Sequence, residues 1–155
     1  MSANLDLASL WGRLTAVTTL AFTSQSFNSG SGWDGTGTGS VKVETTDARS
    51  MLFHENGRWS PQEGTSLQFT NVFRWTSLPD ESRLRLEHLR FGNAHPVYLF
   101  ELEQTGETVW KSIEPHVCSE DLYSASLSLE NESLHLDWTV KGDTKNERIS
   151  YIYQC

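Results

Sequence analysis

The sequence is poor in three features that each point to a particular class of protein: cysteine, basic residues and apolar runs of membrane-spanning length. Its 155 residues include two cysteines, Cys118 and Cys155, which are too few for a disulfide framework. Lys and Arg number 12 against 20 Asp and Glu, which gives a formal net charge of -8. The apolar stretch from Leu14 to Phe22 contains threonines and is too short to cross a bilayer.

Each of these absences argues against a partner or a location. Nucleic acid and anionic membranes bind basic surfaces, so an acidic chain argues against both as the main partner. The locally basic stretch Arg83–Arg90 is interleaved with Glu87 and His88, a pattern typical of a solvated strand face. Both cysteines are interpreted as free thiols in a reducing compartment. Since the N-terminus also lacks the basic region of a signal peptide, a cytoplasmic location is predicted.

What the sequence does contain is alternation and aromatic residues. Apolar residues make up 37% of the chain, and six Trp, seven Phe and four Tyr are among them. Large aromatic side chains bury much surface each and suit a core or a cavity wall. The length fits one domain over residues 1–155.

Period-2 alternation recurs in short runs that are separated by turn residues, which predicts strands joined by short connections. A helix is predicted at Leu5–Trp11 with Asn4 as its N-cap, and Asn56-Gly57 is interpreted as a hairpin turn. The predicted strands are Arg13–Phe27, Gly37–Thr46, Met51–Glu55, Leu67–Trp75, Leu84–Phe91, Val97–Glu103, Thr108–Ile113, His116–Leu129, Leu134–Val140 and Arg148–Tyr153.

Short turns permit only antiparallel neighbours, and a meander of about ten twisted strands curls and closes. We therefore predict an all-β fold, a closed antiparallel up-and-down barrel of about ten strands with a short N-terminal helix. A two-sheet sandwich is the alternative, but it needs longer connections, and the chain offers one candidate at residues 28–36.

The segment Gly30–Gly35 matches the G-x-G-x-x-G dinucleotide pattern, yet it leads into a strand-like run rather than a helix. Gly35, Gly37 and Gly39 instead lie on one strand face, where missing side chains allow close approach or a sharp bend. The run Trp33-x-Gly-x-Gly-x-Gly resembles that of nitrobindin-type ten-stranded barrels, relatives of the lipocalins. That resemblance covers seven residues and gives no match for a haem-binding histidine.

The C-terminal half carries a second set of polar residues. Their spacing is His116-x-Cys118-x-x-Asp121-x-Tyr123, followed by Trp138-x-Val140-x-Gly142-x-x-Lys145. With Phe53-His54-Glu55-Asn56-Gly57, Phe73-x-Trp75 and Leu84–Phe100, these motifs resemble a family of uncharacterised bacterial and fungal proteins. The resemblance implies a lipocalin-like (calycin) barrel and no established activity.

The run from His116 to Tyr123 leaves several chemical interpretations open. His116 and Cys118 share a strand face, and Asp121 and Tyr123 join them only if a turn or bulge intervenes near residues 119–120. A metal site would need a further ligand such as His88 or His95, and no dense Cys/His spacing supports one. A Cys–His nucleophile would need a closer approach than strand neighbours make. The structural alternative is that His116 and Asp121 satisfy polar groups while Cys118 packs as a small apolar residue.

Other positions are candidates for the barrel interior. His88 and Arg90 share a phase with Leu84 and Leu86, so either both point inward or the apolar phase switches there. An inward Arg is unfavourable unless paired, which would suit an anionic ligand or a buried carboxylate. The predicted ligand-binding residues are His88, Arg90, His116, Cys118, Asp121, Tyr123, Trp138 and Tyr151.

Three functions remain open. The first is non-catalytic binding of a small, partly hydrophobic molecule inside the barrel. The second is an isomerase, cyclase or hydrolase that uses His116, Asp121 and Tyr123 as acid–base groups. The third is a structural or partner-binding module, with a tetrapyrrole or chromophore chaperone as a related possibility. The sequence names no cofactor, no metal and no oligomeric state.

Overall fold

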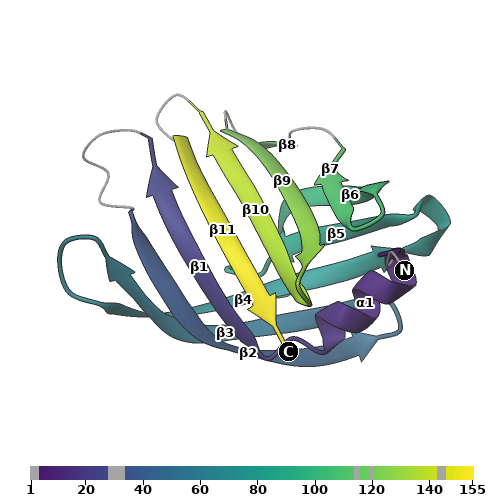
Figure 1. Cartoon of the computed structure of the whole chain (residues 1–155), viewed down its shortest axis with the longest axis horizontal. Coiled ribbons are helices and arrows are strands. Elements are labelled where there is room, and N and C mark those ends of the chain that lie inside the picture. The colour runs from purple at the N-terminus through teal and green to yellow at the C-terminus, as the bar shows by residue number, and fades with distance from the viewer. Residues whose placement is uncertain (1–3, 28–33, 114–115, 119–120, 143–145) are drawn as a thin grey trace.

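The computed structural model describes residues 4–27, 34–113, 116–118, 121–142 and 146–155, and of residues 116–118 and 121 it describes the backbone. The described chain forms one α-helix, one short 3₁₀ helix and eleven strands (Figure 1). The elements are α1 (Leu7–Thr15), β1 (Thr19–Ser26), β2 (Gly35–Asp47), β3 (Ser50–Pro61), β4 (Leu67–Leu78), η1 (Pro79–Glu81), β5 (Arg83–His88), β6 (Val97–Gly106), β7 (Val109–Ser112), β8 (His116–Cys118), β9 (Asp121–Glu130), β10 (Ser133–Lys141) and β11 (Asn146–Gln154).

Ten of these strands close into a barrel. Each strand pairs antiparallel with its neighbour from β1 to β7, then β7 pairs with β9, β9 with β10, β10 with β11, and β11 with β1. The short strand β8 pairs with β9 as well. These pairings confirm the predicted closed antiparallel up-and-down barrel of about ten strands. Neighbouring strands are antiparallel because the short connections between them permit no parallel pairing.

Helix α1 lies across one end of the barrel, beside the chain ends marked in Figure 1. It begins two residues later than predicted, because Asp6 rather than Asn4 is the N-cap: its Oδ1 accepts a hydrogen bond from Ser9 N at 2.8 Å. Leu10 and Leu14 are fully buried in the barrel core. The helix therefore closes this end.

The predicted turn at Asn56-Gly57 is wrong, since both residues lie in the middle of β3. The β2–β3 turn falls at residues 48–49, where Asp47 Oδ1 accepts a hydrogen bond from Arg49 N at 2.8 Å. Gly57 serves close packing instead of a turn: a Cβ there would come within 2.8 Å of the Gly39 Cα on β2.

The glycines of β2 lie on one face of the strand, as predicted, and that face lines the barrel interior. A Cβ at Gly37 would overlap the ring of Phe22, which lies on the adjacent strand β1. The missing side chain therefore makes room for an aromatic ring inside the barrel.

The predicted strand over His116–Leu129 is two strands, β8 and β9, that pair antiparallel. The register pairs His116 with Tyr123 and Cys118 with Asp121. This antiparallel pairing brings the four positions together in the backbone.

Closely packed side chains fill the half of the barrel next to α1. The chain passes from α1 into β1 at Thr19, which pairs with Gln154 near the end of β11, so these strand ends lie beside the helix. The largest fully buried side chains include Trp75, Trp110, Phe53, Phe100, Met51, Leu84, Leu102, Leu127 and Leu136. Strand positions farther from α1 surround a cavity instead.

Candidate functional site

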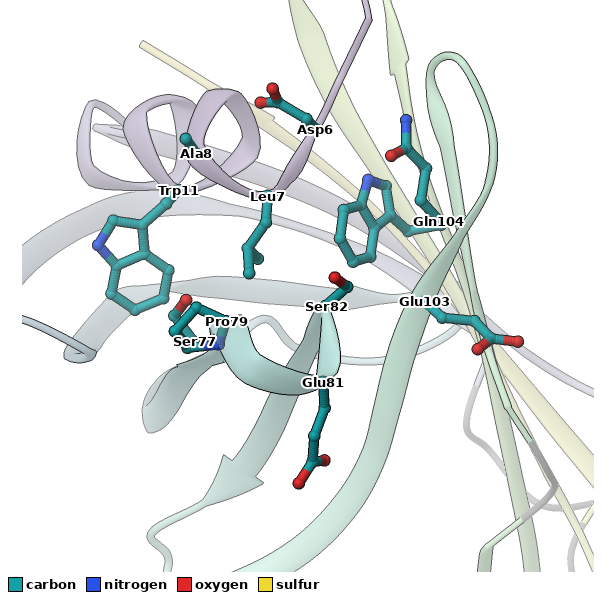
Figure 2. Close-up of a pocket in the computed structure, with 11 residues that line it drawn as sticks. Asp6, Leu7, Ala8, Trp11, Ser77, Pro79, Glu81, Ser82, Glu103 and Gln104 are labelled. Carbon is teal, nitrogen blue, oxygen red and sulfur yellow. The ribbon is translucent and has the colours of Figure 1, made fainter.

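The hollows that are large enough to hold a small molecule differ in position and lining. One of about 390 Å³ is an open surface depression beside Arg13, Glu132 and Cys155. The outer groove, about 700 Å³, lies between α1, η1 and β6 (Figure 2). Figure 2 shows Leu7 of α1 pointing toward η1, with the carboxylates of Glu81 and Glu103 on the rim. Most of its lining side chains are exposed, among them Asp6, Glu81 and Glu103. This groove is an open part of the surface.

The inner cavity, about 330 Å³, lies within the barrel and is largely apolar. Six of its lining side chains are aromatic, and Asn71, His88 and Gln68 supply the polar groups. The lining residues are Phe22, Trp59, Leu67, Gln68, Phe69, Asn71, Phe73, His88, Trp138, Ile149 and Tyr151. A concave, mostly apolar cavity with a few polar groups is the usual make-up of a ligand site, so the inner cavity, which opens to solvent beside Leu67 and Gln68, is the candidate site.

The aromatic walls of the inner cavity are held by contacts among themselves. Phe22 packs edge-on against Phe69 with ring centroids 5.4 Å apart, and it contacts Tyr151 at 5.3 Å. Phe73 stacks on the imidazole of His88 at 4.7 Å. Such contacts fix ring orientation, so the walls are preformed rather than loosely packed.

A buried carboxyl group lies behind this lining. Glu55 on β3 is 2% exposed, and its Oε2 accepts a hydrogen bond of 2.7 Å from the Tyr153 hydroxyl. Within the described chain, Oε1 has no hydrogen-bond partner. Asn71 and Tyr151, which line the cavity, are its neighbours: Asn71 is the cross-strand partner of Glu55 on β4, and Tyr151 stacks on Tyr153 at 5.3 Å. Glu55 thus lies one layer behind the lining of the cavity, next to Asn71 and Tyr151.

Burial raises the pKa of Glu55 to about 7, against the opposing effects of the Tyr153 hydrogen bond and the Asn71 amide. The same burial, together with the Glu55 charge, raises the pKa values of Tyr151 and Tyr153 well above 10. Both phenols therefore stay protonated at neutral pH, and Glu55 is the group of this cluster that titrates there.

His88 is the other titratable side chain in the lining. Burial lowers its pKa below the usual 6.5, and the nearby Arg90 charge acts in the same direction. Its imidazole is therefore neutral at physiological pH. No Lys or Arg side chain is among the described residues that line the cavity.

Of the eight predicted ligand-binding residues, three lie around this one cavity: His88, Trp138 and Tyr151. The indole Nε1 of Trp138 is buried and has no hydrogen-bond partner in the described part of the chain. Tyr123 lies outside the lining and stacks on Trp138 with ring centroids 6.3 Å apart. It supports the wall from behind.

Arg90 does not point into the barrel. Strand β5 ends at His88, and Arg90 is an exposed turn residue whose guanidinium lies 4.9 Å from the centre of the Phe91 ring. Gly92, at φ 88°, donates to Leu89 O at 3.0 Å and closes this turn. Strand β5 ends two residues before Arg90, so the alternation that placed Arg90 in phase with His88 does not extend to it.

His116, Cys118 and Asp121 are placed by backbone alone. Their pairing across β8 and β9 has been given above, and their side chains lie outside the described residues. Their predicted roles, as acid–base groups or ligand contacts, stay predictions.

Sequence reasoning missed most of the lining, including the polar residues Gln68 and Asn71, and it missed Glu55 behind the lining. Asn71 stands between Phe69 and Phe73 on the same strand face, so strand alternation could have found it. Glu55 was hidden by the turn predicted directly after it. The continued alternation of Glu55, Gly57 and Trp59 was the available signal.

Among the described residues, no group of three or more His, Cys, Asp and Glu side chains is arranged to hold a metal ion. In the same part of the chain, none of the helices has the length and apolarity needed to cross a membrane.

Comparison with protein families gives a match that covers most of the chain. The model of a family described as a family of unknown function (DUF6314) matches residues 21–155, which takes in strands β2 to β11 completely. No curated protein matches the chain. The expectation of an uncharacterised family with a barrel fold is confirmed.

Proposed function

We propose that the protein binds one small, partly hydrophobic molecule in its inner cavity. The chain belongs to the DUF6314 family, a family of unknown function, so this proposal starts from the structure of the cavity. The observation that carries this proposal is the cavity itself: six aromatic side chains surround it, with Asn71 and His88 as polar groups. A barrel needs no such space for stability, since well-packed interiors leave few voids larger than a water molecule.

The size of the cavity narrows the ligand. Its volume of about 330 Å³ is near the lower end of the range of ligand pockets, roughly 300–1,000 Å³. This favours a molecule of one or two rings over a tetrapyrrole, whose four linked rings need more room.

The enzyme hypothesis stays a prediction, because two of its three residues, His116 and Asp121, have side chains outside the described part.

The finer classification of the fold also belongs to the proposal. A closed up-and-down barrel with an internal cavity and a helix across one end supports a lipocalin-like relationship. Cys155 is an exposed free thiol, which supports a reducing, cytoplasmic environment. The acidic net charge of -8 supports a small molecule rather than nucleic acid or an anionic membrane as the main partner.

A fluorescent probe tests the proposal. Phenylnaphthylamine is apolar and brightens when it leaves water, and we expect saturable binding at one probe per protein. Ile149 lines the cavity from β11, so Ile149→Trp should fill part of the space and weaken probe binding by about tenfold or more. Displacement of the probe by candidate ligands would then report their affinities.

A matched control lies on the same strand. Ile152 faces outward and is 38% exposed, so Ile152→Trp should leave the affinity unchanged. Probe binding that is absent from the wild-type protein, or that both variants alter equally, would contradict binding in the barrel.

A further inference from the structure

The charge distribution around the inner cavity is one-sided. Glu55 is an ionisable acid directly behind the lining, and the lining itself includes no Lys or Arg among the described residues. An anionic ligand would therefore lose its hydration without gaining a counter-ion, and the single N–H of Trp138 does not replace one. A cationic ligand would find both a carboxylate and aromatic ring faces.

The position of Glu55 gives a second reason. Its carboxyl is buried and accepts a hydrogen bond from Tyr153. Glu55 is not itself a lining residue, but the lining residues Asn71 and Tyr151 are its neighbours, so its charge acts on the cavity from directly behind the wall. A protonated amine in the cavity supplies the opposite charge.

On these grounds we propose that the ligand is an aromatic amine, a one- or two-ring body with a cationic nitrogen, and that Glu55 is its counter-ion. This inference rests on the proposed function and specifies its ligand class. The ring system occupies the aromatic lining, and the ammonium group lies beside Asn71 and Tyr151. Attraction to Glu55 acts across a thin layer of side chains because burial lowers the effective dielectric.

The proposal predicts that amine affinity depends on pH through Glu55. Its flanking titratable groups are Tyr151 and Tyr153 on β11, whose pKa values lie well above 10. On the adjacent strands, the partners Val41 of β2 and Asn71 of β4 do not titrate. With a pKa of about 7, Glu55 is mostly protonated at about pH 6 and mostly ionised at about pH 8.

His88 is the other titratable group of the lining, and it needs its own control. A protonated imidazole would also repel a cation at low pH. Burial and the Arg90 charge lower the pKa of His88 below 6.5, so its imidazole protonates at a lower pH than Glu55 does. Whatever the affinity of His88→Gln, the step in amine binding near pH 7 should remain in this variant.

Three probes of one shape test the proposal: naphthylmethylamine, naphthalenemethanol and naphthoate. Calorimetry near pH 8 should show the amine binding about tenfold more tightly than the alcohol, with naphthoate the weakest. Lowering the pH to about 6 should weaken the amine about tenfold and leave the alcohol unchanged. In Glu55→Gln, the amine should fall to the affinity of the alcohol at both pH values.

A measurement on the wild-type protein does not depend on any variant. At about pH 7, where Glu55 is half protonated, amine binding should release roughly half a proton, seen as a buffer-dependent binding heat. Absence of proton release would overturn the role of Glu55.

The outcomes separate the two proposals. If none of the three probes binds, the cavity function fails and the ligand class fails with it. If the alcohol binds and the amine has no advantage, or the advantage survives in Glu55→Gln, the ligand class alone is wrong. If the alcohol matches the amine and both need Glu55, the carboxyl recognises a neutral donor, and the cationic class is again wrong.

Discussion

Replacing Glu55 with Gln should stabilise the protein at alkaline pH and leave its stability almost unchanged at acid pH. The reason is that the wild-type carboxyl, 2% exposed, is costly to ionise in the folded state. Gln has the same shape, keeps an oxygen that can accept from the Tyr153 hydroxyl, and carries no charge at any pH.

The magnitude follows from the pKa of Glu55, which rises from 4.5 to about 7 on folding. Between these values the folded protein holds a proton that the unfolded chain has released, so wild-type stability falls as the pH rises through this window. Above about pH 7 the loss is complete and amounts to roughly 3 kcal/mol, at about 1.4 kcal/mol per pKa unit. Below about pH 4.5 it vanishes.

Urea unfolding of wild type and Glu55→Gln at about pH 4 and pH 8 gives the comparison. We expect the variant to gain roughly 3 kcal/mol over wild type at the higher pH and close to nothing at the lower one. Glu63→Gln, an exposed position after β3, is the control and should differ from wild type by less than about 0.5 kcal/mol at both. Equal differences for Glu55→Gln at the two pH values would refute the reasoning.

Three further predictions can be tested by the same unfolding assay. Tyr153→Phe removes the hydroxyl bonded to Glu55 and should cost about 1–3 kcal/mol. Tyr151→Phe removes a hydroxyl that is not the hydrogen-bond donor to this carboxyl and should cost clearly less; equal losses would argue against the 2.7 Å bond. Gly37→Ala should lower the free energy of unfolding by about 1–3 kcal/mol, because the added methyl group overlaps an aromatic ring. Gly12→Ala has open space around it in α1 and should raise the free energy of unfolding by about 0.5–1 kcal/mol. The reverse order would contradict the packing described. Asp6→Ala should lose about 1 kcal/mol and helical signal together with the N-cap, and an unchanged helix would place the cap elsewhere.

The barrel could be predicted because alternation and short connections are local properties of the sequence. Period-2 patterning fixed which residues share a face, and turns of a few residues fixed antiparallel order. Closure then follows from twist, because a ten-strand meander left open would expose two edges. None of these steps needs a contact between distant residues.

The errors arose where a tertiary contact decided the local structure. Asn56-Gly57 is a strong hairpin signal in isolation. Inside the barrel, Gly57 is required because Gly39 of the next strand lies too close for a Cβ. The helix start shows the same effect: Asn4 accepts a bond of 2.7 Å from Gln104, so the capping role passes to Asp6.

The site was harder to predict because strand alternation indicates which face a side chain is on. It does not indicate how far along the barrel axis that side chain lies. Alternation left an inward His88 as one of two alternatives, and His88, Trp138 and Tyr151 do line the cavity. Alternation could not, however, tell the packed half of the barrel from the hollow half. Arg90 failed for another reason, since a strand's phase holds only to its last residue. Strand ends depend on turn geometry, here the one closed by Gly92.

Folding and binding meet at the boundary between the packed and hollow halves. Glu55 lies there, with Tyr153 in the packed half on one side and the cavity residue Tyr151 on the other. An ionised Glu55 opposes folding, and a cation in the cavity would relieve that opposition by binding the folded state alone. The stability lost by wild type above pH 7 should therefore be recovered by a saturating amine, whereas Glu55→Gln should gain no more from the amine than from the alcohol. A thermal shift series with the two naphthalene probes near pH 8 measures this directly. An amine that stabilises both proteins equally would separate the cost of Glu55 in folding from any part in recognition.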